Sequence, residues 1–430
     1  MKNITRRAFL KIAGVASATG VLGYSTMARA AGTNKGSARV IVVGGGFGGA
    51  TCARYLRRLD QGIAVTLIEP SVKFITCPFS NLVLGGLRTM DSITHGYNAL
   101  KQIHGVNMIH DTVDRIDPVG KKLTLKGGKT LTYDSLVVSP GIDFNWDAID
   151  GYSEKAAQVM PHAWKAGPQT VLLRNQLKAM KNGGKVIIVS PPNPFRCPPG
   201  PYERASMIAH YLKQHKPRSK IVILDAKDKF SKQALFQDGW EKLYPGMIEW
   251  VSGAKGGTTQ RVDVKKMLVD ADLVKHKADV VNLIPHQTAG KIAVKTGLVD
   301  KTGWCPVDPK TFESKLHAGI HVIGDSAIAG ALPKSGFAAS SEAKMCAAAI
   351  IALFNGETPP ENSFVNTCYS LIAPRYGISV AGVYRNMEKG ITEIEGAGGV
   401  SPREAPDSFR EDEAKYTFGW YESIVADIWG

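Results

Sequence analysis

The sequence lacks several features that would place it in a familiar class of binding protein. It has no Cys-x-x-Cys pair, which excludes zinc-ribbon sites and covalent attachment of a c-type haem. It has no clustered stripe of basic residues, so nucleic acid is not an expected partner. His317 and His321 are four residues apart, but they flank a glycine and enter a predicted strand, so we expect no metal site. Beyond the first thirty residues no apolar run approaches transmembrane length, and we expect no stable membrane insertion.

The first thirty residues have the features of an export signal. Residues 5–11 (TRRAFLK) resemble a twin-arginine signal, and a weakly apolar stretch at 12–27 leads to the small-x-small cleavage site at 28–30. An uncleaved N-terminal anchor is the alternative, but this apolar run is short and rich in Gly, Ala, Ser and Thr. We therefore expect residues 1–30 to be a signal peptide of the twin-arginine pathway, and the mature protein to be periplasmic.

The hydrophobic pattern of the remaining chain predicts an α/β fold with two Rossmann-like units. The first unit has a strand at 39–43, a helix at about 47–59 and a strand at 64–69. The stretch 131–141, which has a buried-strand run ending in a Pro-Gly turn, is expected to close it. The second has a strand at 185–190, a helix at about 201–215 and a strand at 220–225. These two βαβ starts are an internal repeat of fold type.

Residues 44–49 (GGGFGG) contain the pattern G-x-G-x-x-G between a predicted strand and a predicted helix. In this pattern Gly44 permits the tight turn, Gly46 lets a pyrophosphate approach the backbone, and Gly49 lets the helix pack closely on the strand. Glu69, at the end of the second strand, can accept hydrogen bonds from a ribose hydroxyl group. Together they predict a dinucleotide site, because a merely glycine-rich turn explains neither the spacing nor the acid.

A later segment distinguishes FAD from NAD. Gly324 and Asp325 end a predicted strand before a helix, which resembles the second flavin fingerprint of the pyridine nucleotide-disulfide reductase superfamily. The resemblance implies that Asp325 binds the ribityl chain of FAD. It also implies that the helix opened near Gly336 points its positive end at the isoalloxazine ring. The alternative for Asp325 is a helix N-cap or turn residue.

These signals divide the chain into five expected segments. Residues 36–150 and 287–356 form the two parts of an FAD-binding domain, and residues 151–286 form a second Rossmann-like domain. A smaller C-terminal α+β interface domain follows at 357–430, after the chain break near residue 357, and the signal peptide occupies residues 1–30.

The second unit lacks what a nicotinamide cofactor needs. The turn after its first strand reads PPNPFRCPP at 191–199, with no glycine close to the strand. Its prolines also remove the backbone N–H groups that would bind a pyrophosphate. We therefore expect the NAD site to be lost, so that electrons enter and leave by other routes.

The six cysteines are Cys52, Cys77, Cys197, Cys305, Cys346 and Cys368. In an oxidising compartment they could pair in fifteen ways, so their spacing leaves the bridges open. Cys52 and Cys346 lie in predicted helices with Ala-rich faces, which is typical of small buried residues. Cys197 precedes a helix opened by Pro201, and the helix dipole there favours its thiolate.

Four segments resemble the flavoprotein subunit of the flavocytochrome c sulfide dehydrogenases, and the similarity covers essentially the whole mature chain. The segments are 74–81 (FITCPFSN), 196–205 (RCPPGPYERA), 333–336 (PKSG) and 366–370 (NTCYS). They are more diagnostic than the glycine loop, which many dinucleotide-binding proteins share. Phe337 departs from the family, whose members have a tyrosine there, so no role that depends on a hydroxyl group is expected of it.

The resemblance implies roles for five side chains. Cys77 would join the flavin 8α-methyl group as a thioether, and Cys197 and Cys368 would form a redox-active disulfide over the flavin. Glu203 would be the nearby acid or base, and Trp420 would pack beside the flavin. Each role has a structural alternative that the residues alone leave open. Cys197 and Cys368 could form a purely structural disulfide worth on the order of 5 kcal/mol, and Glu203 could be a first-turn carboxylate that stabilises its helix. Cys77 could be a free loop thiol, and Trp420 could be a core residue.

The resemblance implies an FAD-dependent enzyme that oxidises hydrosulfide through the disulfide and passes electrons to a c-type cytochrome. Because this chain has no haem-attachment motif, the cytochrome would be a separate subunit of a heterodimer, docked against the domain after Glu357. One alternative is a sulfide:quinone oxidoreductase, which would need a hydrophobic C-terminal surface, whereas residues 416–430 include Glu422 and Asp427. The other is a non-catalytic flavin-binding interaction protein.

Overall fold

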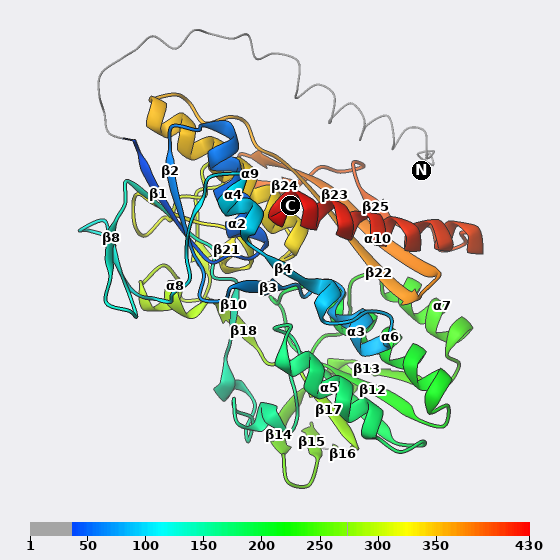
Figure 1. The fold of residues 1–430 in the computed structure, drawn as a ribbon. Coiled ribbons are helices and arrows are strands. Elements are labelled where there is room, and N and C mark those ends of the chain that lie inside the picture. The colour runs from blue at the N-terminus through cyan, green and yellow to red at the C-terminus, as the bar shows by residue number, and fades with distance from the viewer. Residues whose placement is uncertain (1–36, 273) are drawn as a thin grey trace. The chain divides into compact units, whose positions relative to one another are not determined.

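Five parallel strands form the first sheet, in the order β20–β9–β1–β2–β5, in a computed structural model that describes residues 37–272 and 274–430 (Figure 1). The predicted signal peptide lies outside the described residues. The strands are β1 (Arg39–Val43), β2 (Ala64–Ile68), β5 (Asn107–Ile109), β9 (Ser135–Val138) and β20 (Ile320–Val322). They are runs of buried Val, Ile and Leu, as expected for a parallel sheet that is covered on both faces. The late strand β20 thus returns to the sheet that β1 begins.

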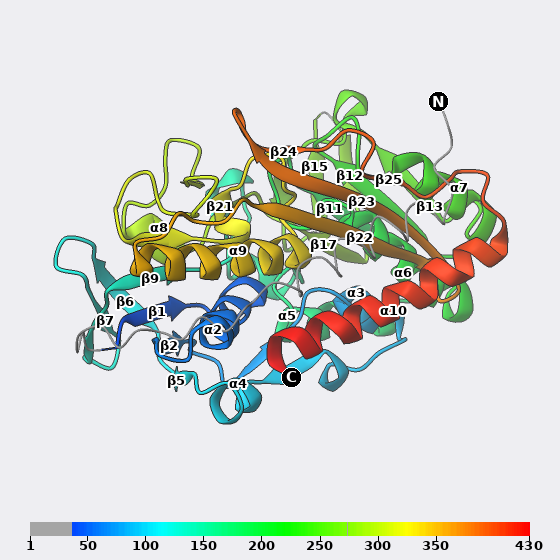
Figure 2. The ribbon, with the colours of Figure 1, turned by 90° about the horizontal axis from the view of Figure 1, so that it is seen from above.

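Helices α2 (Phe47–Leu59) and α9 (Gly336–Asn355) pack side by side beside this sheet (Figure 2). The buried hydroxyl groups of Thr51 on α2 and Ser340 on α9 lie 3.4 Å apart, and both helices have buried small residues such as Ala50 and Ala343. By length and composition α9 could cross a membrane, although no apolar run of that length was expected beyond residue 30. More than half of its apolar window is buried inside the protein, so we assign α9 as a core helix.

A three-stranded antiparallel sheet follows β5 along the chain, formed by β6 (Val113–Asp117), β7 (Lys122–Leu125) and β8 (Thr130–Thr132). The stretch 131–141 was predicted to contain a buried-strand run that ends in a Pro-Gly turn and closes the first unit. That run is β9, which joins the parallel sheet, whereas β8 before it belongs to the antiparallel sheet. The chain changes direction at Asp134, whose carboxylate accepts a hydrogen bond from the backbone N–H of Arg39 at 2.8 Å. An ion pair between the same two side chains, at 3.0 Å, holds this corner.

The second domain contains a parallel sheet in the order β13–β12–β11–β17. Its elements are α5 (Pro168–Ala179), β11 (Lys185–Ser190), α6 (Gly200–His215), β12 (Lys220–Asp225), α7 (Gln233–Leu243), β13 (Ile248–Val251) and β17 (Val280–Leu283). A small sheet of β14 (Thr259–Asp263), β15 (Leu268–Ala271) and β16 (Val274–Lys277) adjoins it. The helix predicted from about residue 201 begins at Gly200. The predicted repeat of the βαβ order is therefore present.

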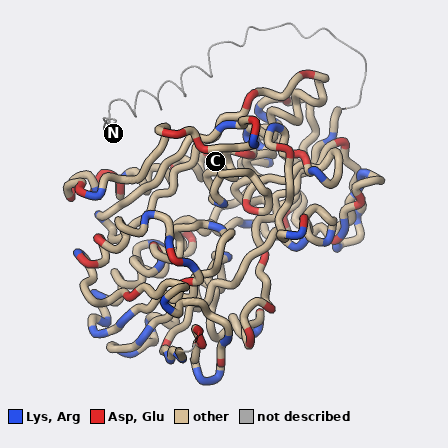
Figure 3. Tube along the Cα trace, turned by 180° about the vertical axis from the view of Figure 1, so that it is seen from behind, with Lys and Arg blue, Asp and Glu red and all other residues tan. Residues whose placement is uncertain are grey.

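Basic residues are concentrated in this second domain. Between residues 170 and 285 lysine and arginine outnumber aspartate and glutamate by about two to one, and Figure 3 shows them spread along this part of the trace. A surface of this sign raises the local concentration of small anions.

The chain ends in a long antiparallel hairpin and a helix. The hairpin strands are β22 (Ser363–Ala373) and β23 (Tyr376–Met387), with β24 (Gly390–Glu393) and β25 (Gly399–Val400) paired to β23. Helix α10 (Asp407–Trp429) packs mainly on β23 (Figure 2). Strand β22 also contacts α6 of the second domain and α9 of the first, so this hairpin lies against both.

Short elements complete the described chain. They are β3 (Lys73–Ile75), α3 (Ser80–Gly85), β4 (Thr94–Gly96), α4 (Asn98–Gln102), β10 (Ile142–Phe144), β18 (Gln287–Ala289), α8 (Lys291–Lys295), β19 (Cys305–Pro306) and β21 (Ala327–Ile328). Strands β10 and β18 pair antiparallel where the chain leaves the first sheet for the second domain and where it returns. The exact domain boundaries stay predictions.

Candidate active site

The loop between β1 and α2 has the close backbone approaches that the glycine pattern predicts. Gly44 has a φ of 99°, and a Cβ atom there would lie 2.3 Å from the carbonyl oxygen of Ser139. A Cβ atom at Gly49 would lie 1.8 Å from the carbonyl oxygen of Gly44. Gly46 is the N-cap of α2, and no side chain caps the helix there. The N–H groups of the first helical turn can therefore bind a pyrophosphate.

Glu69 directly follows β2 and faces this loop. One carboxylate oxygen accepts a hydrogen bond from the N–H of Gly45 at 2.9 Å, and the other accepts one from the N–H of Ser71 at 3.0 Å. Each oxygen keeps a lone pair for a ribose hydroxyl group. Tyr97 donates a hydrogen bond to the carbonyl oxygen of Gly45 at 3.1 Å. The predicted acid and the predicted loop thus lie together.

Asp325 follows β20, and one of its carboxylate oxygens lacks a hydrogen-bond donor in the described part of the chain. Its Oδ1 atom is buried and accepts no hydrogen bond from any described residue, while Oδ2 lies 3.9 Å from a guanidinium nitrogen of Arg196. Burial raises the pKa of Asp325, and the positive charges of Arg196 and Lys334 oppose that rise. A buried acceptor of this kind fits a ribityl hydroxyl group. The glycine loop, Glu69 and Asp325 therefore fit the pyrophosphate, the ribose and the ribityl chain of FAD.

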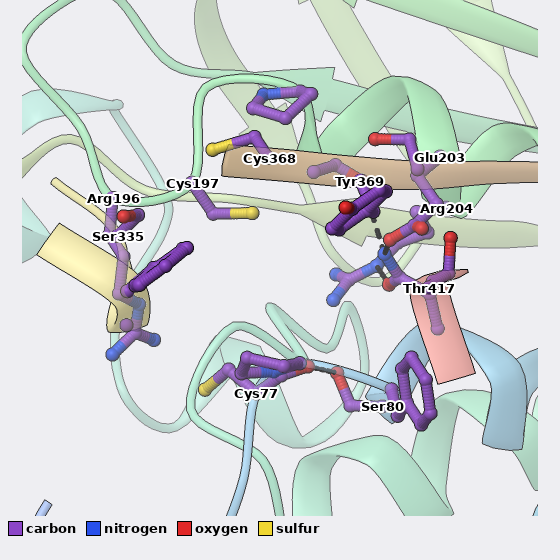
Figure 4. A pocket seen from close by; sticks show the side chains of 18 of the residues that line it. Cys77, Ser80, Arg196, Cys197, Glu203, Arg204, Ser335, Cys368, Tyr369 and Thr417 are labelled. Atoms are coloured by element: carbon purple, nitrogen blue, oxygen red, sulfur yellow. Dashed lines mark hydrogen bonds between the residues drawn. The ribbon is translucent and has the colours of Figure 1, made fainter. Parts of the chain in front are cut away.

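One cavity brings the remaining predicted site residues together (Figure 4). Figure 4 shows Cys197 and Cys368 on one side of this cavity and Cys77 on the other. The predicted site residues that line it are Cys77, Cys197, Glu203, Gly336, Cys368 and Trp420. They come from the first domain, the second domain and the C-terminal hairpin and helix. Side chains separated by hundreds of residues thus share one cavity.

Cys197 is held in an unusual backbone conformation beside α6. Its φ is 59°, in the left-handed region, and its N–H donates a hydrogen bond to the carbonyl oxygen of Lys334 at 2.8 Å. A Cβ atom at Gly200 would lie 3.0 Å from the Cys197 sulfur, so the glycine leaves room for the thiol at the helix start. The helix dipole was expected to favour a thiolate. Burial instead raises the pKa of Cys197, nearby Cys368 and Glu203 raise it further, and Arg196 lowers it.

Cys368 lies on β22, and its sulfur accepts a hydrogen bond from Asn366 at 3.4 Å. Asn366 in turn accepts a hydrogen bond at 2.6 Å from Ser335, the residue that caps α9. All six cysteines are thiols in the structure. The disulfide between Cys197 and Cys368 therefore stays a prediction, although the two residues share a cavity.

The four segments that carry the family resemblance are joined by hydrogen bonds. The pair Asn366–Ser335 links 366–370 to 333–336, and the bond from Cys197 to Lys334 links 333–336 to 196–205. Asn81 donates to Glu203 at 2.8 Å and so links 74–81 to 196–205. The motifs are therefore parts of one site rather than four separate features.

Cys77 lies in the loop between β3 and α3, where its thiol donates a hydrogen bond to the carbonyl oxygen of Trp164 at 3.3 Å. The preceding residue, Thr76, bonds to the hydroxyl group of Tyr421 on α10 at 2.7 Å. That hydroxyl group also lies 3.0 Å from His95. The C-terminal helix thus helps to fix the loop that presents Cys77 to the cavity.

Glu203 lies in the first turn of α6 and points its carboxylate toward β22. One oxygen accepts a hydrogen bond from the N–H of Leu371 at 2.9 Å, and the other accepts the bond from Asn81. Burial raises the pKa of Glu203, while these hydrogen bonds and the positive charges of Lys232 and Arg204 oppose the rise. A glutamic acid that keeps its proton to a higher pH suits an acid or base near neutrality.

Two features of the site were missed at the sequence level. Arg204 is 2% exposed and donates to Asn81, to Asn282 and to the carbonyl oxygens of His162 and Ala163. Burial lowers the pKa of Arg204 to about 10. The second missed feature is Trp164 in the cavity wall, whose buried indole N–H group, like that of the predicted Trp420, has no partner among the described residues. Arg204 belongs to a motif that was recognised, but nothing in the sequence showed that it would be buried.

In the second domain, protein side chains occupy the position that corresponds to Glu69. Asp225 ends β12 and is 0% exposed. Its carboxylate accepts hydrogen bonds from Tyr202 at 2.5 Å, from Trp250 at 2.9 Å and from Lys227 at 2.6 Å. Phe230 stacks on Tyr202 with ring centroids 3.6 Å apart. Protein donors therefore occupy both carboxylate oxygens of the acid that would otherwise bind a ribose.

This arrangement predicts that neither NADH nor NADPH reduces the bound flavin at a useful rate. The proline-rich turn offers no phosphate loop, and Asp225 has no free capacity for a ribose. Anaerobic mixing of the flavoprotein with excess NADH should leave the visible flavin absorbance unchanged over minutes. Rapid bleaching by either nucleotide would overturn this assignment of the second domain.

The fold and this site define a flavoprotein oxidoreductase. Residues 38–171 match the pyridine nucleotide-disulphide oxidoreductase family. Residues 170–285 match the central domain of the flavoprotein chain of sulfide dehydrogenase [flavocytochrome c], and residues 360–429 match the flavin-binding domain of flavocytochrome c sulphide dehydrogenase. The chain belongs to the flavocytochrome c sulfide dehydrogenase flavoprotein family.

Individual proteins agree with this assignment. A 48-residue sequence of the sulfide dehydrogenase flavoprotein chain from Chlorobaculum thiosulfatiphilum is 67% identical and is covered completely, over 11% of this chain. The mitochondrial sulfide:quinone oxidoreductase of Mus musculus is 23% identical over 68% of this chain and 66% of its own length. The crystal structure of the Aquifex aeolicus sulfide:quinone oxidoreductase has a TM-score of 0.68 and 17% identity, over 91% of this chain and 92% of that one.

The comparisons confirm the predicted family, the α/β fold class and an FAD-dependent oxidoreductase. Flavin binding is supported by the flavin-binding domain match. The roles of the single site residues stay predictions.

Proposed function

We propose that this chain oxidises hydrosulfide through Cys197 and Cys368, with FAD as the electron acceptor. One observation carries the proposal: these two cysteines, from the second domain and from the C-terminal hairpin, line the same cavity as Cys77. A purely structural disulfide would not need a cavity beside it. Membership of a sulfide dehydrogenase family supports hydrosulfide as the substrate.

In the proposed reaction hydrosulfide attacks one sulfur of a Cys197–Cys368 disulfide. The S–S bond breaks, a new S–S bond joins the substrate sulfur to one cysteine, and the other cysteine becomes a thiolate. Bound FAD supplies a two-electron acceptor. When the pair loses two electrons and one proton, the disulfide forms again and one sulfur leaves at the oxidation level of elemental sulfur. Glu203, with its raised pKa, is placed to take that proton.

The charges around the cavity suit an anionic substrate. Arg196 and Arg204 line it, and Lys232 lies behind Cys368. The basic second domain adds a favourable field at longer range. These positive charges would attract hydrosulfide, which is an anion at neutral pH, and stabilise the thiolate formed from it.

We expect the flavin to be covalently attached at Cys77, because its thiol faces the cavity from the side opposite the other two cysteines. Acid-precipitated wild-type protein should therefore stay yellow. In Cys77→Ala the flavin should appear in the supernatant after precipitation, while the native variant still binds FAD through the glycine loop. Free flavin in the supernatant of the wild type would contradict the assignment.

We further propose a separate c-type cytochrome as the electron acceptor, in the periplasm. The apolar side chains at the end of the C-terminal helix are buried: Ile428 is 0% and Trp429 5% exposed. Asp427 forms an ion pair with Lys344 at 2.7 Å. A quinone reductase would instead need an apolar surface for the bilayer.

The test compares electron acceptors. The isolated chain should be reduced by sulfide but should pass electrons on slowly until a c-type cytochrome purified with it from the native source is restored. If the isolated chain reduces quinones efficiently and gains nothing from the cytochrome, the chain is a sulfide:quinone oxidoreductase. If sulfide does not reduce it at all, the flavin-binding interaction protein is the better reading.

A further inference from the structure

A buried lysine of the second domain lies directly behind Cys368. Lys232 is 7% exposed, and its ammonium group donates hydrogen bonds to the carbonyl oxygen of Cys368 at 2.7 Å and to the hydroxyl group of Ser370 at 2.8 Å. Both acceptors are uncharged, so the ammonium group keeps its full charge next to the cysteine. A lysine is rarely buried unless the charge has a use there.

The backbone of Lys232 is also unusual. Its φ is 61° and its ψ is 29°, in the left-handed region, at the N-cap position of α7. A residue with a Cβ atom adopts this conformation only where its surroundings enforce it, and such residues cluster at functional sites. Here the conformation lets the side chain leave the start of α7 and reach β22.

Two side chains of the second domain, one basic and one acidic, form hydrogen bonds with strand β22. Lys232 binds Cys368 and Ser370, and Glu203 accepts the N–H of Leu371. Cys197 belongs to the same second domain, so these contacts fix the position of one cysteine relative to the other. The domain that has lost its nicotinamide site thus holds the cysteine pair together.

Acidic groups on the neighbouring elements favour the positive charge of Lys232, whereas burial disfavours it. Burial lowers the pKa of Lys232 to about 8, whereas Cys368 on β22, Glu203 on α6, Cys197 before α6 and Glu413 on α10 all raise it. The amine is therefore a cation at neutral pH. These four groups are the ones whose negative charge it would offset.

We propose that Lys232 is a positioning residue that holds Cys368 against Cys197 and stabilises the negative charge that appears at this pair when it is reduced. The inference deepens the proposed function and rests on it. In that reaction, the charge that enters with hydrosulfide ends on a cysteine sulfur as the S–S bond breaks. A fixed cation that is bonded to the backbone of Cys368 and interacts electrostatically with both cysteines stabilises the product of this step without having to move.

The test measures thiolate character without using sulfide. The FAD-containing protein is reduced with a thiol, freed of it under anaerobic conditions and alkylated with iodoacetamide, and the labelling of Cys368 is followed by peptide mass spectrometry. In Lys232→Met we expect labelling of Cys368 at neutral pH to slow about tenfold, because the nearby positive charge is gone. The matched control is Lys229→Met, which removes an exposed lysine three residues earlier and should label as the wild type does.

A second variant, Lys232→Gln, keeps a hydrogen-bond donor and removes only the charge. It should show the same slowing with normal FAD content, and it keeps the test valid if Lys232→Met does not fold. Wild-type labelling rates in Lys232→Gln would overturn the proposal. The labelling test uses no sulfide, so it is independent of the proposed function. If sulfide does not reduce the wild-type protein but the Lys232 variants are still labelled slowly, the proposed function fails and the role of Lys232 remains supported.

Discussion

The Cys197→Ser variant should reduce its flavin with sulfide roughly a thousandfold more slowly than the wild type, or not measurably. A serine at this position cannot form the disulfide, so hydrosulfide has no S–S bond to attack. Cys368→Ser should behave in the same way, because the two residues act as one unit. The measurement is anaerobic stopped-flow mixing with sulfide, followed by the flavin absorbance.

Two controls separate chemistry from damage to the fold. Both variants should keep their FAD and should still be reduced by dithionite, because neither cysteine belongs to the dinucleotide-binding loop. Cys305→Ala is the matched cysteine variant: Cys305 is buried and is outside the cavity lining, so sulfide reduction should be close to normal. Near-normal turnover in Cys197→Ser would mean that the pair is only a structural link.

The Gly49→Ala variant should lose most of its FAD. The new methyl group would lie 1.8 Å from the carbonyl oxygen of Gly44 and 3.3 Å from a methyl group of Val42, so α2 must move away from β1. Such overpacking costs on the order of 3 kcal/mol, and it displaces the helix start that binds the pyrophosphate. The measurement is the ratio of flavin to protein after purification, with the melting temperature alongside.

Gly419→Ala is the matched control for that variant. Gly419 is also a helical glycine, and a Cβ atom there would meet nothing within 4 Å. Its FAD content should be that of the wild type. Full flavin occupancy in Gly49→Ala would show that the loop does not bind the cofactor as described.

The first dinucleotide site could be predicted from the sequence because its signals are local. The glycine pattern, the acid after the second strand and the Gly-Asp pair after a later strand each have a fixed place relative to a strand end. The structure places Gly44, Glu69 and Asp325 accordingly. The cavity that unites three cysteines was inferred only through the family resemblance, because no local rule joins residues 77, 197 and 368.

The sequence of helix α10 has a helical periodicity that did not enter the prediction. Its buried residues Ala414, Thr417, Tyr421, Ile424 and Ile428 follow each other at alternating spacings of three and four, which is the pattern of a helix with one buried face. The mixture of aromatic and charged residues masked it, and the segment was described only as part of an α+β domain. Within the stretch 131–141 the sequence did not show where the buried strand begins, because β9 starts directly after Asp134, which makes a long-range pair with Arg39.

The role proposed for Lys232 and the hydrogen bonds that occupy Asp225 could not be predicted, because each depends on contacts between distant segments. The sequence showed that the second turn lacks glycine, but not that Tyr202 and Trp250 bind Asp225. Likewise, no pattern near residue 232 indicates that its ammonium group will reach Cys368, more than a hundred residues later. Tertiary structure is needed to see either.

The central claim is that sulfide delivers its electrons to the flavin through this site. Anaerobic titration of the wild-type protein with sulfide tests it most directly. The oxidised flavin absorbance should bleach in proportion to added sulfide, with about one equivalent per flavin, since one hydrosulfide carries the two electrons that FAD accepts. A flavin spectrum that stays oxidised in excess sulfide, yet bleaches fully with dithionite, would contradict it.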